Sequence, residues 1–256
     1  MHLERISHFK YPVDLQPLEE EWLSAIEFLR SFTFVNGEYM VNEWLHSGKH
    51  ILAEGAQGSM LDVDFGSYPF VTSSNTTCAG ACTGLGIAPR HIGKVIGIFK
   101  AYCTRVGSGP FPTELKEETG EKLRACGNEF GSTTGRPRRC GWLDLVSLRY
   151  TVMLNGVTSM IMTKADVLSG FENLRVATAY LVNGKITTEV PFDTYAQVEP
   201  VYSEIPGWKE DISGVRTKDD LPEKLKSYVR FIENYIGVPV AMVSVGPDRE
   251  ATVVMQ

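Results

Sequence analysis

Long apolar runs and Cys-x-x-Cys pairs are missing from this sequence of 256 residues, and histidines are few. A membrane-spanning helix needs about eighteen or more consecutive apolar residues, and no such stretch occurs, so we expect no membrane partner. The residues after Met1 also lack the apolar core of a secretory signal peptide. These absences predict a cytoplasmic protein.

The few cysteines and histidines exclude two further classes of site. The five cysteines are odd in number and contain no Cys-x-x-Cys pair, which argues against a disulfide framework and a zinc ribbon. Of the five histidines only His46 and His50 are four positions apart, and Gly48 between them disfavours a shared helix, so a metal site built by this chain alone is not expected. We interpret the cysteines as reduced and mostly buried: Cys78, Cys82, Cys103, Cys126 and Cys140.

An excess of positive charge is also absent. The 25 Lys and Arg residues are outnumbered by 31 Asp and Glu residues, giving a net charge of −6, which argues against a protein that coats nucleic acid. Any anion must therefore bind at a local basic patch. At about 150 residues per domain, the length allows one large domain or two small ones. We treat residues 1–256 as one α/β domain portion, in which residues 1–50 form a helical lead-in to residues 51–256.

Hydrophobic periodicity predicts helices in the first hundred residues. One apolar stripe consists of Leu18, Trp22, Ile26 and Leu29, and a second short helix is expected around residues 38–46. The apolar run 51–53 ends in the glycine loop 54–58, as a buried strand would. Pro89 then begins a segment with helical spacing, for which we predict a helix carrying Ile92, Val95, Ile96 and Phe99.

The remaining segments alternate between helices and strands. Loops are expected over 106–142, a helix over 143–154, and buried strands over 159–163, 240–245 and 251–255. Asn183-Gly184 separates two strand-like runs, 175–182 and 185–190, and predicts a hairpin. Asp220 and Glu223 resemble a capping box before a helix with the stripe Leu221, Leu225, Tyr228, Ile232 and Tyr235. This alternation predicts an α/β sheet with an antiparallel hairpin.

The segment Thr163-Lys164-Ala165-Asp166 directly follows a predicted strand. A carboxylate there can accept hydrogen bonds from N1–H and the exocyclic amine of guanine, while the lysine stem lies along the purine. The alternative is a strand that ends in solvated charges. The loop Ser244-Val245-Gly246-Pro247 follows another strand and supports the guanine interpretation, because α/β sheets bind ligands at their carboxyl edge.

The segment 131–139 concentrates three arginines, Arg136, Arg138 and Arg139, behind two threonines and between glycines. Guanidinium groups bind carboxylates and phosphates through paired hydrogen bonds, so this loop predicts an anion site. A solvated basic loop is the alternative. Binding to RNA is less favoured, because no aromatic residue interleaves with the arginines before Trp142.

Two loops rich in glycine and hydroxyl residues, 55–58 and 72–77, could hold a phosphate or a purine edge. Each is a weak signal by itself, because such loops are common. A G-x-x-x-x-G-K-[S/T] phosphate loop is not found anywhere in the sequence.

Taken together, six ordered stretches resemble the motifs of the adenylosuccinate synthetase family, whose members join inosine monophosphate (IMP) and L-aspartate with GTP in AMP biosynthesis. The resemblance begins at about Ile51, and residues 1–50 match only loosely. The stretches are 54–62, 71–77, 104–114, 131–142, 163–166 and 244–249. The resemblance implies a mostly parallel, P-loop-NTPase-like sheet flanked by helices, without its amino-terminal phosphate-loop part.

The resemblance also implies roles for individual residues. Residues 51–256 would be the substrate- and guanine-binding region. Transition-state support would come from Gln57 and Arg136. IMP would be bound by Gln57, Thr72 and Arg136. Aspartate would be bound by Ser132, Thr133, Thr134, Gly135, Arg136, Pro137 and Arg138. GTP, the co-substrate, would be bound by Arg138, Lys164, Ala165, Asp166, Ser244, Val245 and Gly246.

The family's glycine-rich loop, whose aspartate acts as base and helps to hold Mg²⁺, and its catalytic histidine have no counterpart here. We therefore interpret the chain as the carboxyl-terminal portion of the enzyme, which would be a homodimer at full length. The Mg²⁺ ligands are expected in the missing part, and the isolated chain is expected to lack synthetase activity. The alternative is a non-catalytic module that binds guanine nucleotides.

Overall fold

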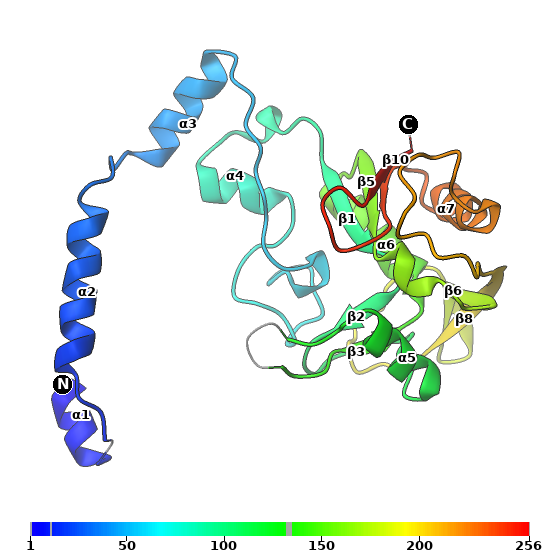
Figure 1. Ribbon diagram of the computed structural model, residues 1–256, viewed down its shortest axis with the longest axis horizontal. Helices are drawn as coiled ribbons and strands as arrows, with labels where there is room; N and C mark the ends of the chain where they lie inside the picture. Colours follow the sequence, from blue (N-terminus) through cyan, green and yellow to red (C-terminus); the bar gives the residue numbers. More distant parts are fainter. Residues whose placement is uncertain (1, 11, 132–134, 256) are drawn as a thin grey trace. The chain divides into compact units, whose positions relative to one another are not determined.

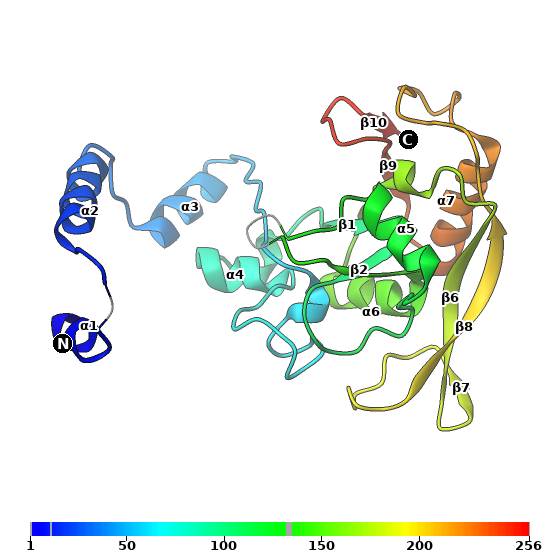
Figure 2. The ribbon, with the colours of Figure 1, turned by 60° about the horizontal axis from the view of Figure 1, so that its bottom comes forward.

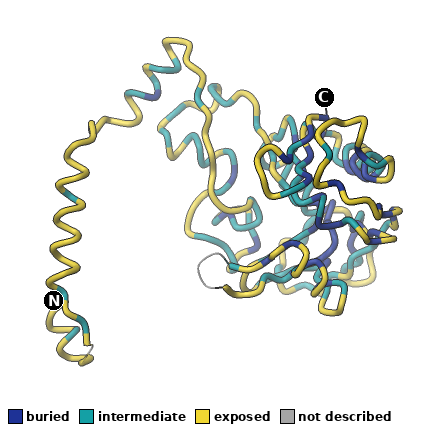
Figure 3. Tube along the Cα trace, viewed as in Figure 1, coloured by how far each residue is buried: buried dark blue, intermediate teal, exposed yellow. Residues whose placement is uncertain are grey.

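The computed structural model describes residues 2–10, 12–131 and 135–255, and it divides the chain into two compact units, residues 1–50 and 51–256. The described residues of the first unit form the helices α1 (His2–His8), α2 (Gln16–Leu29) and α3 (Gly37–His46). Helices α2 and α3 confirm the sequence prediction. None of the residues of α2 is buried, as Figure 3 shows, and Trp22 of the predicted stripe is 63% exposed. The stripe therefore forms no core within this unit.

A four-stranded sheet forms the centre of the second unit (Figure 1). Its order is β1-β5-β9-β10, where β1 pairs with β5 and β5 with β9 in parallel, and β9 pairs with β10 antiparallel. The strands are β1 (Ile96–Lys100), β5 (Ser159–Thr163), β9 (Val240–Ser244) and β10 (Thr252–Val254). This arrangement confirms the mostly parallel sheet.

Helices α6 (Leu145–Asn155) and α7 (Glu223–Ile236) pack with this sheet through one hydrophobic core. The predicted stripe of α7 supplies Leu225, Tyr228 and Ile232, which are all almost fully buried. The hydroxyl of Tyr228 donates a 2.7 Å hydrogen bond to the carbonyl of Ala101, just beyond β1. Helix α7 is thereby tied to the end of β1.

Antiparallel pairing dominates the rest of the unit. Strand β6 (Asn173–Val182) pairs antiparallel with β7 (Lys185–Thr187) and β8 (Val198–Pro206), as Figure 2 shows. Its pairing with the short β4 (Leu143–Asp144) is parallel. The β6–β7 hairpin confirms the prediction, since Asn183 and Gly184 have φ values of 50° and 77°. A separate ribbon joins β2 (Cys103–Arg105) to β3 (Arg139–Gly141).

Short helices complete the unit. The loop-rich segment 106–142 contains α5 and β3, and the rest of its described residues lie in loops, bends or bridges. The short elements are η1 (Ser59–Leu61), α4 (Ala79–Leu85), η2 (Pro89–His91), α5 (Glu118–Cys126) and η3 (Ala165–Leu168).

Two sequence predictions are wrong in this unit. The helix from Pro89 is only the 3-10 turn η2, and residues 96–100 form β1. Gly93, Gly97 and four β-branched residues disfavour a helix, and pairing with β5 favours a strand. The run 51–53 is not a strand either, because no strand among the described residues pairs with it, and Leu52 is 91% exposed.

Two smaller expectations are also corrected. Helix α7 begins after Pro222 without a side-chain cap, because the Asp220 carboxylate accepts a hydrogen bond from the Thr217 hydroxyl instead. The cysteines are free, but only Cys140 is buried, and Cys126 is exposed. The remaining three, Cys78, Cys82 and Cys103, are partly buried.

Candidate functional site

The two loops predicted to hold guanine meet at one edge of the central sheet. Strands β5 and β9 are parallel neighbours, so Thr163 and Ser244 lie at the same carboxyl edge. Lys100, the last residue of β1, pairs with Thr163 at this edge. Figure 1 shows β1 and β5 side by side. The sheet therefore places residues 163–166 and 244–246 where ligands of α/β sheets bind.

The Lys164 motif adopts a specific backbone conformation. Lys164 has a φ of 63°, which turns the chain sharply from β5 into η3, and its Nζ donates to the carbonyl of Gly127 at 2.7 Å. Ala165 is fully buried, so it can meet a ligand only through its backbone. Burial raises the pKa of Asp166, which the charge of Lys164 opposes. The motif therefore presents a partly buried carboxylate under the influence of a lysine charge.

The loop after β9 is held by its own hydrogen bonds. The hydroxyl of Ser244 donates to the carbonyl of Gly246 at 2.9 Å, and the N–H of Val245 donates to the carbonyl of Ala251 at 2.9 Å. Val245 is also buried, so neither its side chain nor its N–H faces outward for a base. Ser244 and Gly246 remain the candidates for ligand contact.

The arginine loop joins the same edge through Glu129. The Glu129 carboxylate is 1% exposed and accepts hydrogen bonds from Lys100 Nζ at 2.7 Å, Tyr102 Oη at 2.6 Å and Arg138 Nη1 at 2.9 Å. Burial opposes ionisation of Glu129, but these donors outweigh it and keep its pKa below the usual value. Because Lys100 ends β1, Arg138 is anchored at the sheet edge.

The structure describes the arginine loop at Gly131 and from Gly135 onward. The N–H of Gly131 donates to the carbonyl of Arg136 at 2.8 Å, and Gly135 has a φ of 64°. Gly135, Arg136 and Pro137 are exposed. Ser132, Thr133 and Thr134, the other predicted aspartate ligands, lie outside the described residues.

Arg139 forms an ion pair within the protein, whereas the sequence predicted that it contributes to an anion site. Its Nε and Nη2 donate to both oxygens of Glu114, at 2.8 and 2.6 Å, and its Nη1 donates to the carbonyls of Gly107 and Gly109. The ion pair raises the pKa of Arg139 and lowers that of Glu114. This guanidinium is committed to holding the β2–β3 ribbon, so it is not a free anion donor.

The two glycine loops lie together around Asp62. This carboxylate is fully buried and accepts from the N–H groups of Asp64, Phe65, Thr76 and Thr77 at 2.7 to 3.2 Å. Burial opposes ionisation, yet the four donors keep the pKa of Asp62 below its usual value. Asp62 thus ties the segment that follows loop 55–58 to loop 72–77.

The candidate IMP residues sit on these loops. Gln57 is exposed with a φ of 62°, and the N–H of Thr72 donates to the carbonyl of Leu61 at 2.9 Å. Arg105 of β2 donates from Nη2 to the hydroxyl of Ser67 and the carbonyl of Phe70. Since Arg105 pairs with Arg139 in the ribbon, the glycine loops are connected to the base of the arginine loop.

Sequence reasoning missed Lys100, Tyr102 and Glu129, and assigned no task to Asp62 or Arg105. Asp62 and Arg105 lie inside stretches that carry the family resemblance, which was an available signal. Glu129 is a single acidic residue among loop glycines, and the sequence carries no sign that three distant donors converge on it.

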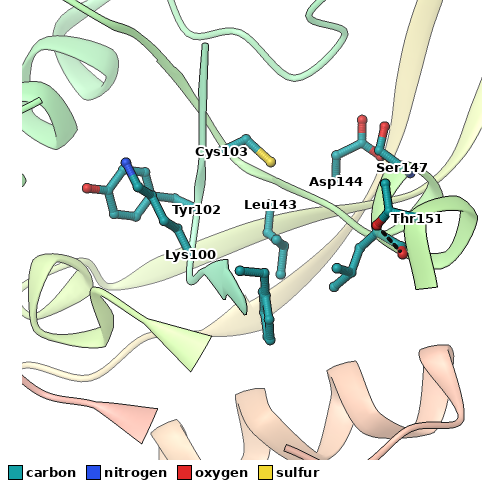
Figure 4. Close-up of a pocket in the computed structure, with 9 residues that line it drawn as sticks. Lys100, Tyr102, Cys103, Leu143, Asp144, Ser147 and Thr151 are labelled. Atoms are coloured by element: carbon teal, nitrogen blue, oxygen red, sulfur yellow. Dashed lines mark hydrogen bonds between the residues drawn. The ribbon is translucent and has the colours of Figure 1, made fainter. Parts of the chain in front are cut away.

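Metal ligands do not cluster in the part of the chain that the structure describes, and a small pocket lies beside Lys100. No three His, Cys, Asp or Glu side chains among the described residues are grouped to hold a metal ion, and no described helix is long and apolar enough to cross a membrane. A pocket of about 140 Å³ lies between Lys100, Tyr102, Leu143 and Ser147 (Figure 4). Ligand pockets usually measure about 300 to 1,000 Å³, so this one is too small for a nucleotide.

Comparison with known proteins gives a consistent result. A family model described as adenylosuccinate synthetase matches residues 1–253. Adenylosuccinate synthetases of Parabacteroides distasonis and Porphyromonas gingivalis are 56% and 57% identical over 99% and 100% of this chain. The structure of fully ligated adenylosuccinate synthetase from Plasmodium falciparum superposes with a TM-score of 0.89 at 39% identity, covering 98% of this chain and 61% of that one.

The extent of the match sets one limit. The family model matches from residue 1, so the match includes residues 1–50. The chain spans about 60% of the length of the curated relatives. With a family match over nearly all its residues, this chain belongs to the adenylosuccinate synthetase family.

Proposed function

We propose that this chain supplies the guanine-, IMP- and aspartate-binding part of an adenylosuccinate synthetase. The reaction would join IMP and L-aspartate with GTP to give adenylosuccinate, GDP and phosphate. The observation that supports this most is the convergence of Lys164, Asp166 and Arg138 at the carboxyl edge of β1, β5 and β9.

In this proposal Asp166 accepts from the guanine N1–H and exocyclic amine, while Lys164 covers the purine. Ser244 and the backbone of Ala165 and Gly246 complete the guanine site. Adenine has no matching donor pair, so it is excluded. Val245 would contribute only by packing, because its N–H is bonded to Ala251.

The chemistry requires two transfers. The γ-phosphoryl group of GTP moves to the 6-oxygen of IMP. The amine of aspartate then attacks C6 of the purine and displaces phosphate, which leaves with the 6-oxygen. Gln57 would face the reacting side of the purine, and Thr72 the 5′-phosphate. Arg136 and Arg138, with Gly135 and Pro137 shaping the loop, would bind the carboxylates of aspartate, and Arg138 would also reach GTP. Arginines stabilise the charge that develops during phosphoryl transfer.

Mg²⁺ would serve this reaction by neutralising phosphate charge. The described residues do not offer a set of three acidic or histidine ligands for it, so we derive no step through the metal. A homodimer and a cytoplasmic location belong to this proposal as expectations.

The central experiment is calorimetric titration of the 256-residue chain with GDP, ADP and IMP. GDP should bind at least tenfold more tightly than ADP, and IMP should bind at a separate site. Asp166→Asn should weaken GDP binding at least tenfold, because the amide cannot accept both guanine hydrogen bonds. Glu199→Gln, an exposed change on β8, should leave GDP affinity unaltered.

The outcomes separate the candidate functions. Guanine preference without IMP binding would favour the non-catalytic guanine-nucleotide module instead. Equal binding of GDP and ADP would overturn the guanine assignment. Synthetase turnover by this chain alone would contradict the expectation that it is inactive.

A further inference from the structure

A single buried carboxylate connects the lysine and arginine sides of the candidate site. Glu129 lies in the short segment 127–129 that follows α5, and its Oε1 accepts from Lys100 and Tyr102 while its Oε2 accepts from Arg138. Burial of a carboxylate is costly unless it is paired and hydrogen-bonded, and here all three donors are in place.

The backbone of the same segment holds the same partners. The carbonyl of Glu129 accepts from the N–H of Arg138 at 2.9 Å, and the carbonyl of Gly127 accepts from Lys164 Nζ at 2.7 Å. Arg124 of α5 adds a bond from its Nε to the carbonyl of Arg138 at 2.8 Å. Arg138 is therefore fixed through both its main chain and its side chain.

The hydrogen bond from Arg138 to Glu129 leaves part of the Arg138 guanidinium uncommitted. Glu129 engages Nη1 of Arg138, whereas the buried Nε has no hydrogen-bond partner among the described residues. The side chain of Arg138 remains 31% exposed. Two cations, Lys100 and Arg138, share one carboxylate, so the cluster keeps a net positive charge at the sheet edge. Such a cluster can still attract an anion while its orientation is set.

Tyr102 shows how closely this segment is packed. A Cβ atom added at Gly127 would collide with the hydroxyl of Tyr102, so a glycine is required for the tyrosine to reach Glu129. Tyr102 is itself 1% exposed. The packing fixes the carboxylate rather than leaving it to rotate.

We propose that Glu129 is a positioning residue, which orients Arg138 toward the anionic substrate and links the arginine loop to the guanine side of the site through segment 127–129. This inference rests on the proposed function for the identity of the ligand. The orientation of Arg138 by Glu129 can be tested without any ligand.

The ligand-free test uses nuclear magnetic resonance of the arginine Nε–H groups in the full chain, with the Arg138 signal assigned by its loss in Arg138→Lys. In the unmodified chain the Arg138 Nε–H should exchange slowly with water and its guanidinium should rotate slowly. Glu129→Gln should accelerate exchange at Arg138 at least tenfold. Glu118→Gln removes the same charge from the exposed first turn of α5 and should change nothing.

Glu129→Gln leaves two partly buried cations without their carboxylate and can impair folding. The double variant Lys100→Met/Glu129→Gln removes one cation together with the carboxylate, so it should fold while still releasing Arg138. Its circular dichroism and cooperative unfolding verify the fold.

The ligand test is GDP titration of the same variants. Release of Arg138 should weaken GDP binding at least fivefold in both Glu129 variants, and Glu118→Gln should bind as the unmodified chain does. Unchanged Arg138 exchange in both Glu129 variants would overturn the positioning role, whatever the nucleotide result. Failure of the unmodified chain to bind GDP would instead reject the proposed function and leave the exchange result to decide the role of Glu129.

Discussion

Two buried carboxylates, Asp62 and Glu129, organise the loops of this protein. Each accepts at least three hydrogen bonds, Asp62 from backbone N–H groups and Glu129 from side chains of distant segments. Hydrogen bonds to ionised groups are stronger than neutral ones, and a buried group that loses its partners is costly. Loop geometry at the candidate site therefore depends on residues that need not touch a ligand.

Replacement of Asp62 should be strongly destabilising. In Asp62→Asn, one acceptor oxygen is lost and buried N–H groups lose their partners, so unfolding free energy at pH 7 should fall by about 2 to 4 kcal/mol. Urea unfolding followed by circular dichroism measures the change. Asp64→Asn, whose carboxylate is exposed, is the matched control and should cost less than about 1 kcal/mol. Equal effects of the two variants would contradict this view of Asp62.

The same carboxylate should make stability depend on pH. The pKa of Asp62 is lower in the folded chain than the value of about 3.9 expected when unfolded. The stability that Asp62 contributes to the folded chain is therefore complete above the pKa of the unfolded state. It is lost as the pH falls through the lower pKa of the folded state. Between about pH 5 and pH 2, Asp62→Asn should lose less stability than the unmodified chain, in urea titrations at each pH. Parallel pH profiles would refute this.

At the scale of elements, the order of the sheet brings distant motifs together. Parallel neighbours end at the same edge, so residues 163–166 and 244–246, about eighty positions apart, share one site. Helix α7 supports this edge, because Leu225 and Ile232 are fully buried and Tyr228 bonds to Ala101. The packing of this helix therefore stabilises the edge of the sheet.

Shortening a buried side chain of α7 should show how much this helix contributes to stability. Leu225→Ala removes a fully buried side chain and should reduce the free energy of unfolding by about 2 to 5 kcal/mol, since the cavity cannot be refilled completely. Lys224→Ala, at the exposed neighbouring position, should change it by less than about 0.5 kcal/mol. Thermal and urea unfolding provide the measurement, and similar losses in both variants would exclude the packing explanation.

At the scale of the whole molecule, residues 1–50 and 51–256 form separate compact units. The second unit contains the large hydrophobic core, whereas the long helix of the first contains no buried residue. A core of that extent is the source of cooperative stability. The stability of the candidate site should therefore reside in residues 51–256.

Limited proteolysis tests this division. Trypsin should cleave first after Lys49, in the exposed segment between the units, and release a resistant product that begins at His50. The melting temperature of this product should lie within about 3 °C of that of the intact chain, because the core is unchanged. Mass spectrometry identifies the cut, and calorimetry compares the two species. A product that unfolds on cleavage would show that the first unit is required for stability.

The sequence by itself determined the motif order, the β6–β7 hairpin, strand β5 and helix α7, because turn chemistry and hydrophobic periodicity are local properties. Asn183-Gly184 favours its turn through the backbone conformations that these two residue types readily adopt. Only the tertiary structure decided that residues 96–100 form a strand and 51–53 do not, since a strand requires a partner. It alone also gathered Lys100, Tyr102 and Arg138 on Glu129 and committed Arg139 to Glu114. Such choices depend on which distant donors meet a buried charge, and no local pattern contains that information.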